Sequence, residues 1–362
     1  MNAPSGQLGR RMFRAARRLG VLGMGLALPG PPISTDDLIL RVESRFGVSI
    51  RARARFFARR LRVEYRHLSR DLESAVEAPR HDDANADLSA RAVRRALADA
   101  GLRVGSLGYL IGHTATPDTL LPPGVAGVAD RLGYSGPFAE FRQACTGFAN
   151  ALVMAHGLLA ERDAPPVAIV GSETGSMFFD PLRAAEDRGQ LVNLLQMGDA
   201  AACIILGPDD RPGDSLDNFA FGCAGLDLPA GLSLCDGGSA HLMSRRAVPE
   251  FVHDVVAIRR SGPNLFLAGA AAARAFGIDL HSIDAIIPHQ ANGRLDEWIS
   301  ELLQIPAAAV VTMARRVGNT GSAAIWAALA ETRTRLPPGA SAVILGAEAT
   351  KYMFATFRFR KA

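Results

Sequence analysis

Cys145 is the side chain whose type and position most clearly suggest chemistry. Small and apolar residues follow it at helical spacing, among them Ala149, Leu152 and Leu159, so we expect the thiol at the first turn of a buried helix. Unpaired backbone N–H groups and the positive end of the helix dipole meet there, and both favour a thiolate. A thiolate is a good nucleophile at neutral pH. The alternative is a small buried cysteine that only packs a helix.

The elements that must position Cys145 occur twice along the chain in the same order. The first pass predicts helices over 88–100 and 122–132, a strand over 107–111 leading to His113, a helix opened by Cys145, and a strand over 167–173. The second pass predicts helices over 265–276 and 293–303, a strand over 283–287 leading to His289, a helix opened by Asn319, and a strand over 342–348.

The spacing of the two passes also matches. His113 lies 32 residues before Cys145, and His289 lies 30 residues before Asn319. A duplicated α/β unit explains this agreement, with sheets covered by helices on both faces. Strand ends and helix starts of the two halves can then converge on one crevice. We therefore expect Cys145, His289 and Asn319 to lie near one another.

Three motifs resemble one known family. Residues 144–149 read Ala-Cys-Thr-Gly-Phe-Ala, 288–294 read Pro-His-Gln-Ala-Asn-Gly-Arg, and 317–323 read Val-Gly-Asn-Thr-Gly-Ser-Ala. The chain resembles the ketoacyl-ACP synthase III group of thiolase-fold condensing enzymes, from about Val21 to Phe359. The resemblance implies an α/β fold with duplicated βαβαβαββ halves and a five-layered αβαβα architecture. We expect a basic flexible leader over 1–18, an N-terminal half over 19–207 and a C-terminal half over 208–362.

The same resemblance implies a reaction. Cys145 would accept an acyl group from acyl-CoA or an acyl carrier protein. His289, as a neutral imidazole, and Asn319 would donate hydrogen bonds to the carbonyl of a second thioester and stabilise its enolate. A Claisen condensation with a malonyl or β-ketoacyl thioester would follow, in fatty-acid-like or secondary-metabolite biosynthesis. No cofactor is implied beyond CoA or phosphopantetheine thioesters as substrates.

Further residues match positions that bind substrate or partner in the family. Phe56 would stack on the CoA adenine beside Arg60, and Arg294 would face the acidic carrier protein. The resemblance also implies a homodimer, in which Leu121 would lie in a loop that reaches into the neighbouring subunit's site. His113 matches no family role, and we expect it to be structural.

The chain departs from the family after the last core strand, where the family usually has a glycine-rich loop. Residues 346–352 read Gly-Ala-Glu-Ala-Thr-Lys-Tyr. Glu348 is a candidate extra base, but it aligns with Glu173 in the repeat, so a structural role competes. The departure leaves a second hypothesis open: transfer of the acyl group to an oxygen or nitrogen nucleophile without decarboxylation. A non-catalytic partner subunit is disfavoured, because the expected residue types fill all three catalytic positions.

Composition narrows the remaining classes. The chain is 48% apolar and 21% charged with a formal net charge of +4, which is typical of a large globular protein. Its four cysteines form no CxxC pair, so we expect neither a disulfide framework nor a metal site. No basic segment carries a nucleic-acid-binding motif. The apolar run over 21–28 is short and interrupted by glycine, so we expect a buried strand, no membrane span and a cytoplasmic location.

Overall fold

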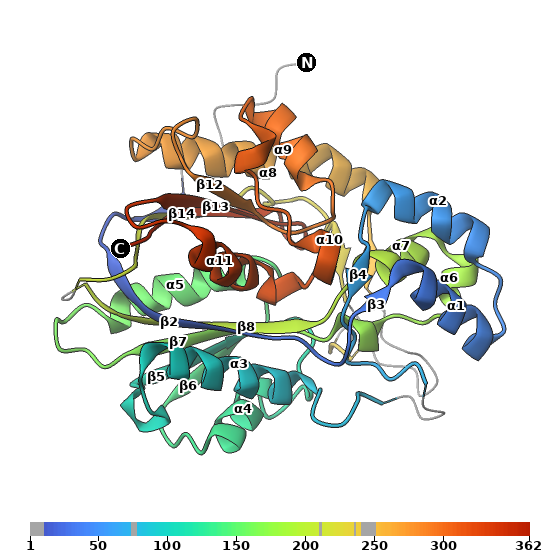
Figure 1. Cartoon of the computed structure of the whole chain (residues 1–362), viewed down its shortest axis with the longest axis horizontal. Helices are drawn as coiled ribbons and strands as arrows, with labels where there is room; N and C mark the ends of the chain where they lie inside the picture. The colour runs from blue at the N-terminus through green and yellow to red at the C-terminus, as the bar shows by residue number, and fades with distance from the viewer. Residues whose placement is uncertain (1–10, 74–77, 210–211, 235–236, 240–250) are drawn as a thin grey trace.

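The chain folds into five stacked layers. The computed structural model describes residues 11–73, 78–209, 212–234, 237–239 and 251–362. Two layers of strands lie between outer helices, and a further helical layer lies between the strand layers (Figure 1). This arrangement confirms the predicted five-layered αβαβα architecture.

The first strand layer has the order β6-β5-β7-β8-β2. Its strands are β2 (Leu19–Ala27), β5 (Tyr109–His113), β6 (Phe138–Phe141), β7 (Val167–Glu173) and β8 (Ala200–Pro208). β5 runs parallel to β6 and β7, whereas β8 is antiparallel to β7 and to β2.

The second strand layer repeats this pattern in the order β12-β13-β14-β9. Its strands are β9 (Ser215–Cys223), β12 (Ala285–Pro288), β13 (Ser341–Glu348) and β14 (Met353–Arg360). β12 and β13 are parallel, and β14 is antiparallel to both β13 and β9. The directions of β12, β13, β14 and β9 match those of β5, β7, β8 and β2, so the structure confirms the duplicated unit. Among the described strands, β6 has no counterpart beside β12.

The two strand layers meet at β2 and β9, which pair over two residues of each strand. β9 also pairs with β1 (Met12–Ala15), and Phe13 packs on Phe219 at 5.8 Å between ring centres. β1 lies within the segment expected to be a flexible leader, so this part of the expectation is wrong. The edge of β9 supplies backbone partners that composition could not reveal, and residues 1–10 lie outside the described part.

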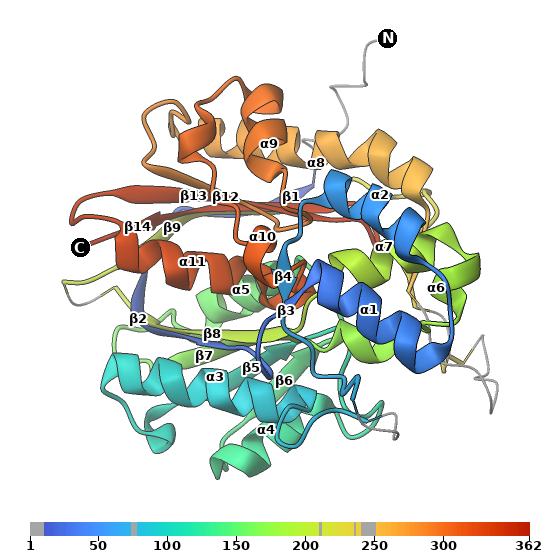
Figure 2. The same cartoon turned by 45° about the vertical axis from the view of Figure 1, so that its right-hand side comes forward.

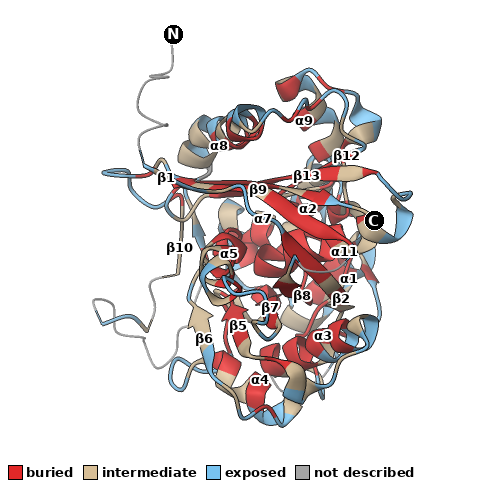
Figure 3. Cartoon of the chain, turned by 90° about the vertical axis from the view of Figure 1, so that its left-hand side faces the viewer, coloured by how far each residue is buried: buried red, intermediate tan, exposed pale blue. Residues whose placement is uncertain are grey.

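Helices cover both outer faces and fill the space between the sheets. Outer helices α3 (Asn85–Ala100) and α4 (Gly124–Leu132) cover the first sheet, and α8 (Val255–Ala275) and α9 (Leu295–Leu303) cover the second (Figures 1 and 2). Between the sheets lie α5 (Gly147–Leu158) and α11 (Ala324–Arg335), which the short η4 (Gly321–Ala323) precedes. Buried residues concentrate on the sheets and these inner helices (Figure 3), where Phe148, Trp326 and Phe357 pack together.

Two glycines show why the first apolar run is interrupted. β2 carries Gly23 and Gly25 where α3 crosses it. A Cβ atom at Gly23 would lie 2.4 Å from the carbonyl oxygen of Ala96, and one at Gly25 would lie 2.2 Å from that of Ala92. The run is therefore a buried strand against which a helix packs closely, as the sequence predicted.

A smaller group of elements lies beside the two sheets. It contains β3 (Ile33–Ser34), α1 (Thr35–Phe46), α2 (Arg51–Leu61), β4 (Tyr65–Arg66), α6 (Arg183–Glu186) and α7 (Arg188–Gln196). Ser34 caps α1 by accepting the N–H of Asp37. The remaining short elements are η1 (Val104–Ser106), η2 (Gly175–Phe178), β10 (Leu232–Ser233), β11 (Val252–His253), η3 (Ala307–Ala309) and α10 (Ala314–Val317).

Helix boundaries account for most differences from the sequence prediction. α8 begins at Val255, ten residues before the predicted start at Leu265. Asp254 caps it by accepting the N–H of Ala257, and Pro263 is accommodated inside the helix. The predicted strand over 167–173 matches β7 at both ends.

Candidate active site

Cys145 lies in the turn between β6 and α5. It is 8% exposed, and Thr146, the next residue, is the N-cap of α5. The next residue is Gly147, where a larger side chain would not fit. A Cβ atom there would lie 2.7 to 2.9 Å from the ring and Cβ of His113. The predicted position at the start of a buried helix is confirmed.

The predicted preference for a thiolate is wrong for the resting protein. Burial raises the pKa of the Cys145 thiol well above its ordinary value, and the carboxylates of Glu348 and Glu173 raise it further. Helix geometry alone favours a thiolate, but desolvation and two nearby negative charges outweigh it. The resting thiol is therefore protonated at neutral pH.

His289 follows the end of β12. Its backbone N–H donates to the carbonyl of Leu345 on β13 at 2.9 Å. The side chain is 6% exposed, and its Nδ1 atom has no hydrogen-bond partner among the described residues. Burial lowers the pKa of His289 to about 4, so the imidazole is neutral at neutral pH, as the expected donor role requires.

Gln290 fixes the segment that carries His289. Its Nε2 donates to the carbonyls of Pro288 at 2.8 Å and Val311 at 3.0 Å. Its Oε1 accepts the N–H of Met313 at 2.6 Å. This buried amide ties the histidine turn to the segment leading toward Asn319.

Asn319 lies between α10 and η4. Its backbone N–H donates to Gln196 at 2.8 Å, and its carbonyl accepts the N–H of Gly198 at 3.1 Å. The side-chain Oδ1 accepts the N–H of Gly321 at 3.0 Å. The N-cap position of η4 is Thr320, so Asn319 lies one residue before the cap expected for it. The backbone at the start of η4 occupies the Asn319 oxygen, which leaves the NH₂ group as the donor end of the amide.

Strand β13 brings the histidine and the cysteine to one place. Leu345 accepts the N–H of His289, and Glu348, the last residue of the strand, accepts the N–H of Thr146 at 2.7 Å. Thr146 is the neighbour of Cys145. Two of the three expected residues thus lie around the carboxyl end of one strand.

The start of η4 also lies close to the segment that carries Cys145. The hydroxyl of Ser322, three residues after Asn319, donates to the carbonyl of Gln143 at 3.3 Å. Gln143 is two residues before Cys145. Segments from both halves therefore meet at Cys145, as the duplicated pattern predicts.

His113 is the counterpart of His289 in the first half and has a different environment. Its Nε2 accepts the indole N–H of Trp326 at 3.2 Å. Complete burial lowers its pKa to about 3. The ring packs beneath Gly147, which is consistent with the structural role expected for it.

The residues expected to bind substrate lie on α2 and before α9. Phe56 is 43% exposed, and the guanidinium of Arg60 lies over its ring at 3.6 Å from the centre. The two groups expected to hold an adenine therefore contact each other. Arg294 pairs with Glu297 at 3.0 Å, and Arg62 at the end of α2 pairs with the same carboxylate.

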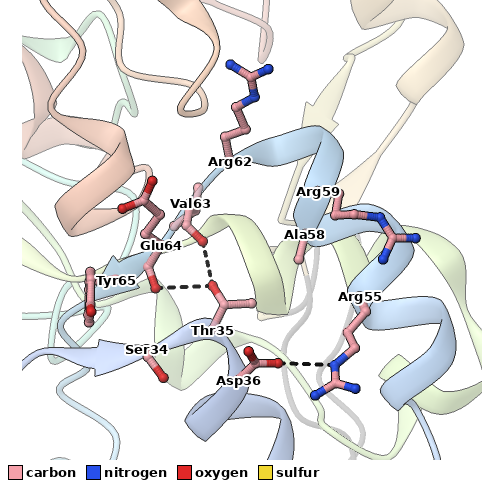
Figure 4. A pocket seen from close by; sticks show the side chains of 10 residues that line it. All are labelled: Ser34, Thr35, Asp36, Arg55, Ala58, Arg59, Arg62, Val63, Glu64 and Tyr65. Atoms are coloured by element: carbon pink, nitrogen blue, oxygen red, sulfur yellow. Dashed lines mark hydrogen bonds and ion pairs between the residues drawn. The ribbon is translucent and has the colours of Figure 1, made fainter.

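An open pocket lies on another face of α2 (Figure 4). Arg55 and Asp36 pair across it at 3.2 Å. It is lined by Ser34, Thr35, Asp36, Arg55, Ala58, Arg59, Arg62, Val63, Glu64 and Tyr65. The lining carries both charges and includes neither Phe56 nor Arg60.

Sequence reasoning missed the polar residues that surround Cys145. Gln143 and Thr146 are tied to each other by a hydrogen bond of 2.9 Å, and Glu173 accepts both the N–H and the hydroxyl of Ser322. The repeat indicated Glu173 and Glu348 as equivalent positions, but it did not indicate their contacts with Ser322 and Thr146. Within the described ranges, no cluster of three or more histidine, cysteine or acidic side chains could hold a metal ion. No helix of that part of the chain is long and apolar enough to cross a bilayer.

Comparison with known proteins points to one family. The model of 3-oxoacyl-[acyl-carrier-protein] synthase III matches residues 139–225, and that of its C-terminal part matches residues 273–356. The 3-oxopimeloyl-[acyl-carrier-protein] synthase of Rhodothermus marinus is 31% identical over 337 residues, which cover 90% of this chain and 88% of that protein. The β-ketoacyl-[acyl-carrier-protein] synthase III of Oleidesulfovibrio alaskensis is 29% identical over 336 residues, or 90% of this chain and 93% of that protein.

Solved structures agree with this comparison. The tetronic acid condensing enzyme AbyA1 is 28% identical with a TM-score of 0.83, covering 94% of this chain and 99% of its own. The 3-oxoacyl-(acyl carrier protein) synthase III of Pseudomonas aeruginosa is 25% identical with a TM-score of 0.76, covering 95% and 98%.

Proposed function

Because this chain belongs to the 3-oxoacyl-[acyl-carrier-protein] synthase III family of condensing enzymes, we propose that it loads an acyl group onto Cys145 and condenses it with a malonyl-type thioester. The acyl donor is an acyl-CoA or an acyl carrier protein, and the reaction uses no cofactor beyond these thioesters. The product is a β-ketoacyl thioester, formed in the cytoplasm.

In the first half-reaction, the Cys145 sulfur attacks the donor carbonyl and forms a new thioester. The donor's C–S bond breaks, and the Cys145 proton passes to the departing sulfur, so that CoA or the carrier leaves as its free thiol and no protein base is needed. The backbone N–H of Cys145 contributes to the oxyanion site. This step exchanges one thioester for another, so its free-energy change is small.

In the second half-reaction, the malonyl thioester loses CO₂, and its electron pair becomes an enolate. His289 and Asn319 donate hydrogen bonds to the enolate oxygen. The enolate carbon attacks the acyl carbonyl, the bond to Cys145 breaks, and the thiolate takes a proton from solvent. Residues from both halves of the chain serve this step.

The observation that carries this proposal is the absence of a free base among the described groups around Cys145. The pKa of His289, lowered by burial to about 4, makes its imidazole a weak base. The carboxylates of Glu348 and Glu173 already accept hydrogen bonds from protein donors. An extender that generates its carbanion by losing CO₂ needs no base, whereas removal of an α-proton does.

Transfer of the acyl group to an oxygen or nitrogen nucleophile passes the nucleophile's proton to the departing Cys145 sulfur, and the release of CO₂ distinguishes it from decarboxylative condensation. Condensation without decarboxylation, in contrast, requires a base that removes an α-proton from the extender. Glu348 was the candidate for that task. Its side chain is 2% exposed, and its oxygens bind Thr146 and Thr350, which favours an anchoring role.

Release of CO₂ tests the proposal directly. Wild-type protein, preloaded with an acyl-CoA, is expected to release CO₂ from a ¹⁴C-carboxyl-labelled malonyl thioester in step with β-ketoacyl product. Malonyl-CoA and malonyl carrier protein are both supplied. Condensed or transferred product without CO₂ from either extender would overturn the decarboxylative step and leave base-dependent chemistry.

We also propose that the protein is a homodimer in which Leu121 bounds the partner's acyl site. β6 lies at the end of the first strand order, and Leu120 and Leu121 are 64% and 85% exposed. Sedimentation is expected to give twice the 38.3 kDa chain mass.

Leu121→Ala is expected to change the acyl-chain preference of loading. Leu226→Ala, at a residue of similar exposure (82%), is expected to leave this preference unchanged. A fully active monomer would contradict the proposal.

Substrate and carrier contacts complete the proposal. Phe56 and Arg60 are assigned to the CoA adenine, which would enter by separating their stacked side chains. Arg294, beside Arg62 and Glu297, is assigned to the acidic carrier protein.

A further inference from the structure

Glu348 stands beside the nucleophile in a buried and fully partnered position. Its Oε2 accepts the backbone N–H and the hydroxyl of Thr146, both at 2.7 Å. Its Oε1 accepts the hydroxyl of Thr350. Glu348 is 2% exposed and Thr146 is fully buried, so these bonds form away from water, where an anchored carboxylate is costly to displace.

Thr146, which Glu348 anchors, is also linked by hydrogen bonds to the segment before Cys145. Thr146 is the N-cap of α5, and its hydroxyl also accepts from the Nε2 of Gln143 at 2.9 Å. Gln143 in turn accepts from the side chain of Asn150, one turn into α5. The cysteine therefore lies between two residues that a single hydrogen-bonded chain connects to the end of β13.

The equivalent carboxylate of the other half makes the reciprocal contact. Glu173 ends β7, as Glu348 ends β13, and its Oε2 accepts the N–H and hydroxyl of Ser322 at 3.1 and 2.9 Å. Ser322 lies at the start of the segment that follows Asn319. A Cβ atom at Gly321 would lie 2.6 Å from this carboxylate, so glycine is needed for the contact. Each half thus supplies a carboxylate that holds the inner-helix start of the other.

We propose that Glu348 is a positioning residue for the nucleophile, which fixes Cys145 at the start of α5 by anchoring Thr146 to the end of β13. The inference rests on the proposed role of Cys145 but on no particular second substrate. Glu348 belongs to the segment 346–352, which lacks the glycines usual in the family. The proposal gives this segment a role in fixing Cys145. It also explains why Glu348 and Glu173 have the same position in the repeat.

The charge of Glu348 provides a separate signature. The pKa of Cys145 is raised by burial first, then by Glu348 and Glu173. His113 and His289 also lie near, but their pKa values of about 3 and 4 keep them neutral above pH 5. Removing the charge of Glu348 should therefore make Cys145 easier to ionise, whereas removing its anchor should misplace the sulfur.

Two substitutions separate these effects in a Cys223→Ala, Cys235→Ala background. It removes the exposed thiol of Cys223 and the thiol of Cys235, which lies outside the described residues. Glu348→Gln keeps an oxygen that can accept from Thr146, so acyl loading is expected within a few-fold of the parent. The pH profile of Cys145 alkylation by iodoacetamide, read by peptide mass, should move to lower pH. Glu348→Ala loses the anchor, and loading should fall by about 100-fold, because small misplacements of reacting groups have effects of that size.

Two substitutions at Thr146 provide a second test in case Glu348→Ala fails to fold. Thr146→Ser retains both donors and should load like the parent, whereas Thr146→Val loses the hydroxyl and should load at least ten-fold more slowly. Loading uses acyl-CoA alone, so absence of condensation by the parent would refute the proposed function and leave this inference intact. The inference would be overturned if Glu348→Gln and Glu348→Ala lost loading equally, or if the alkylation profile of Glu348→Gln did not move. Parental rates of loading in Glu348→Ala and Thr146→Val would also overturn it.

Discussion

Replacing Cys145 by alanine is expected to abolish acyl-enzyme formation. The substitution removes only the sulfur atom from a side chain that is 8% exposed, so the turn and α5 should fold as before. Without the sulfur there is no atom to carry the acyl group. Intact-protein mass after incubation with a panel of acyl-CoA and acyl carrier thioesters should show the acyl increment on the parent and none on the variant.

The other cysteines provide the controls. Cys223 is exposed, so it can react with thioesters nonspecifically, whereas Cys203 is fully buried in β8 and burial raises its pKa. Cys223→Ala should retain the acyl increment, and peptide mapping should locate it at Cys145. Cys235 lies outside the described residues and is also replaced. Stoichiometric loading of the Cys145→Ala protein in a Cys223→Ala, Cys235→Ala background would refute the proposed nucleophile and the function built on it.

Much of the fold could be predicted from sequence because its strands are apolar on both faces. β7 and β13 are buried along nearly their whole length, so each appears as a continuous apolar run whose ends are clear. Equivalent runs, spaced alike before and after Cys145 and Asn319, revealed the duplication. The duplication in turn located His289 at the end of β12.

The charge environment of the nucleophile could not be predicted in the same way. The helix start indicated a thiolate, but the sign of the pKa shift depends on burial and on two carboxylates distant in sequence. Glu348 reaches Thr146 across 202 residues of chain. Local sequence describes a residue's own helix, but only the packed structure shows which side chain from the other half lies against it.

β1 illustrates the same limit at the N-terminus. Met12–Ala15 belongs to a basic segment that sequence reasoning assigned to a leader. Its strand conformation depends on the free edge of β9, about 200 residues away, with which it pairs in antiparallel register. Backbone pairing of this kind leaves little trace in the composition of a four-residue segment.

Replacing either His289 or Asn319 is expected to block the second half-reaction while leaving the first largely intact. Both side chains serve as donors to the enolate of the extender, which does not exist during loading. His289→Ala and Asn319→Ala should each still acquire the acyl group on Cys145 but lose roughly 10²–10³ in the rate of product formation, the usual cost of removing one oxyanion donor. CO₂ release from the malonyl thioester should fall in parallel.

Isosteric variants show whether donation is the lost property. Asn319→Asp keeps the oxygen that accepts the N–H of Gly321 and loses the NH₂ group, so it should load normally and condense no better than Asn319→Ala. His289→Asn restores a donor amide and should recover part of the rate. A base-dependent transfer would give another pattern, in which His289→Ala is severe and Asn319→Ala is mild. Since condensation requires both donors on one enolate oxygen, comparable losses at the two positions, together with intact loading, are the result that supports decarboxylative condensation over transfer.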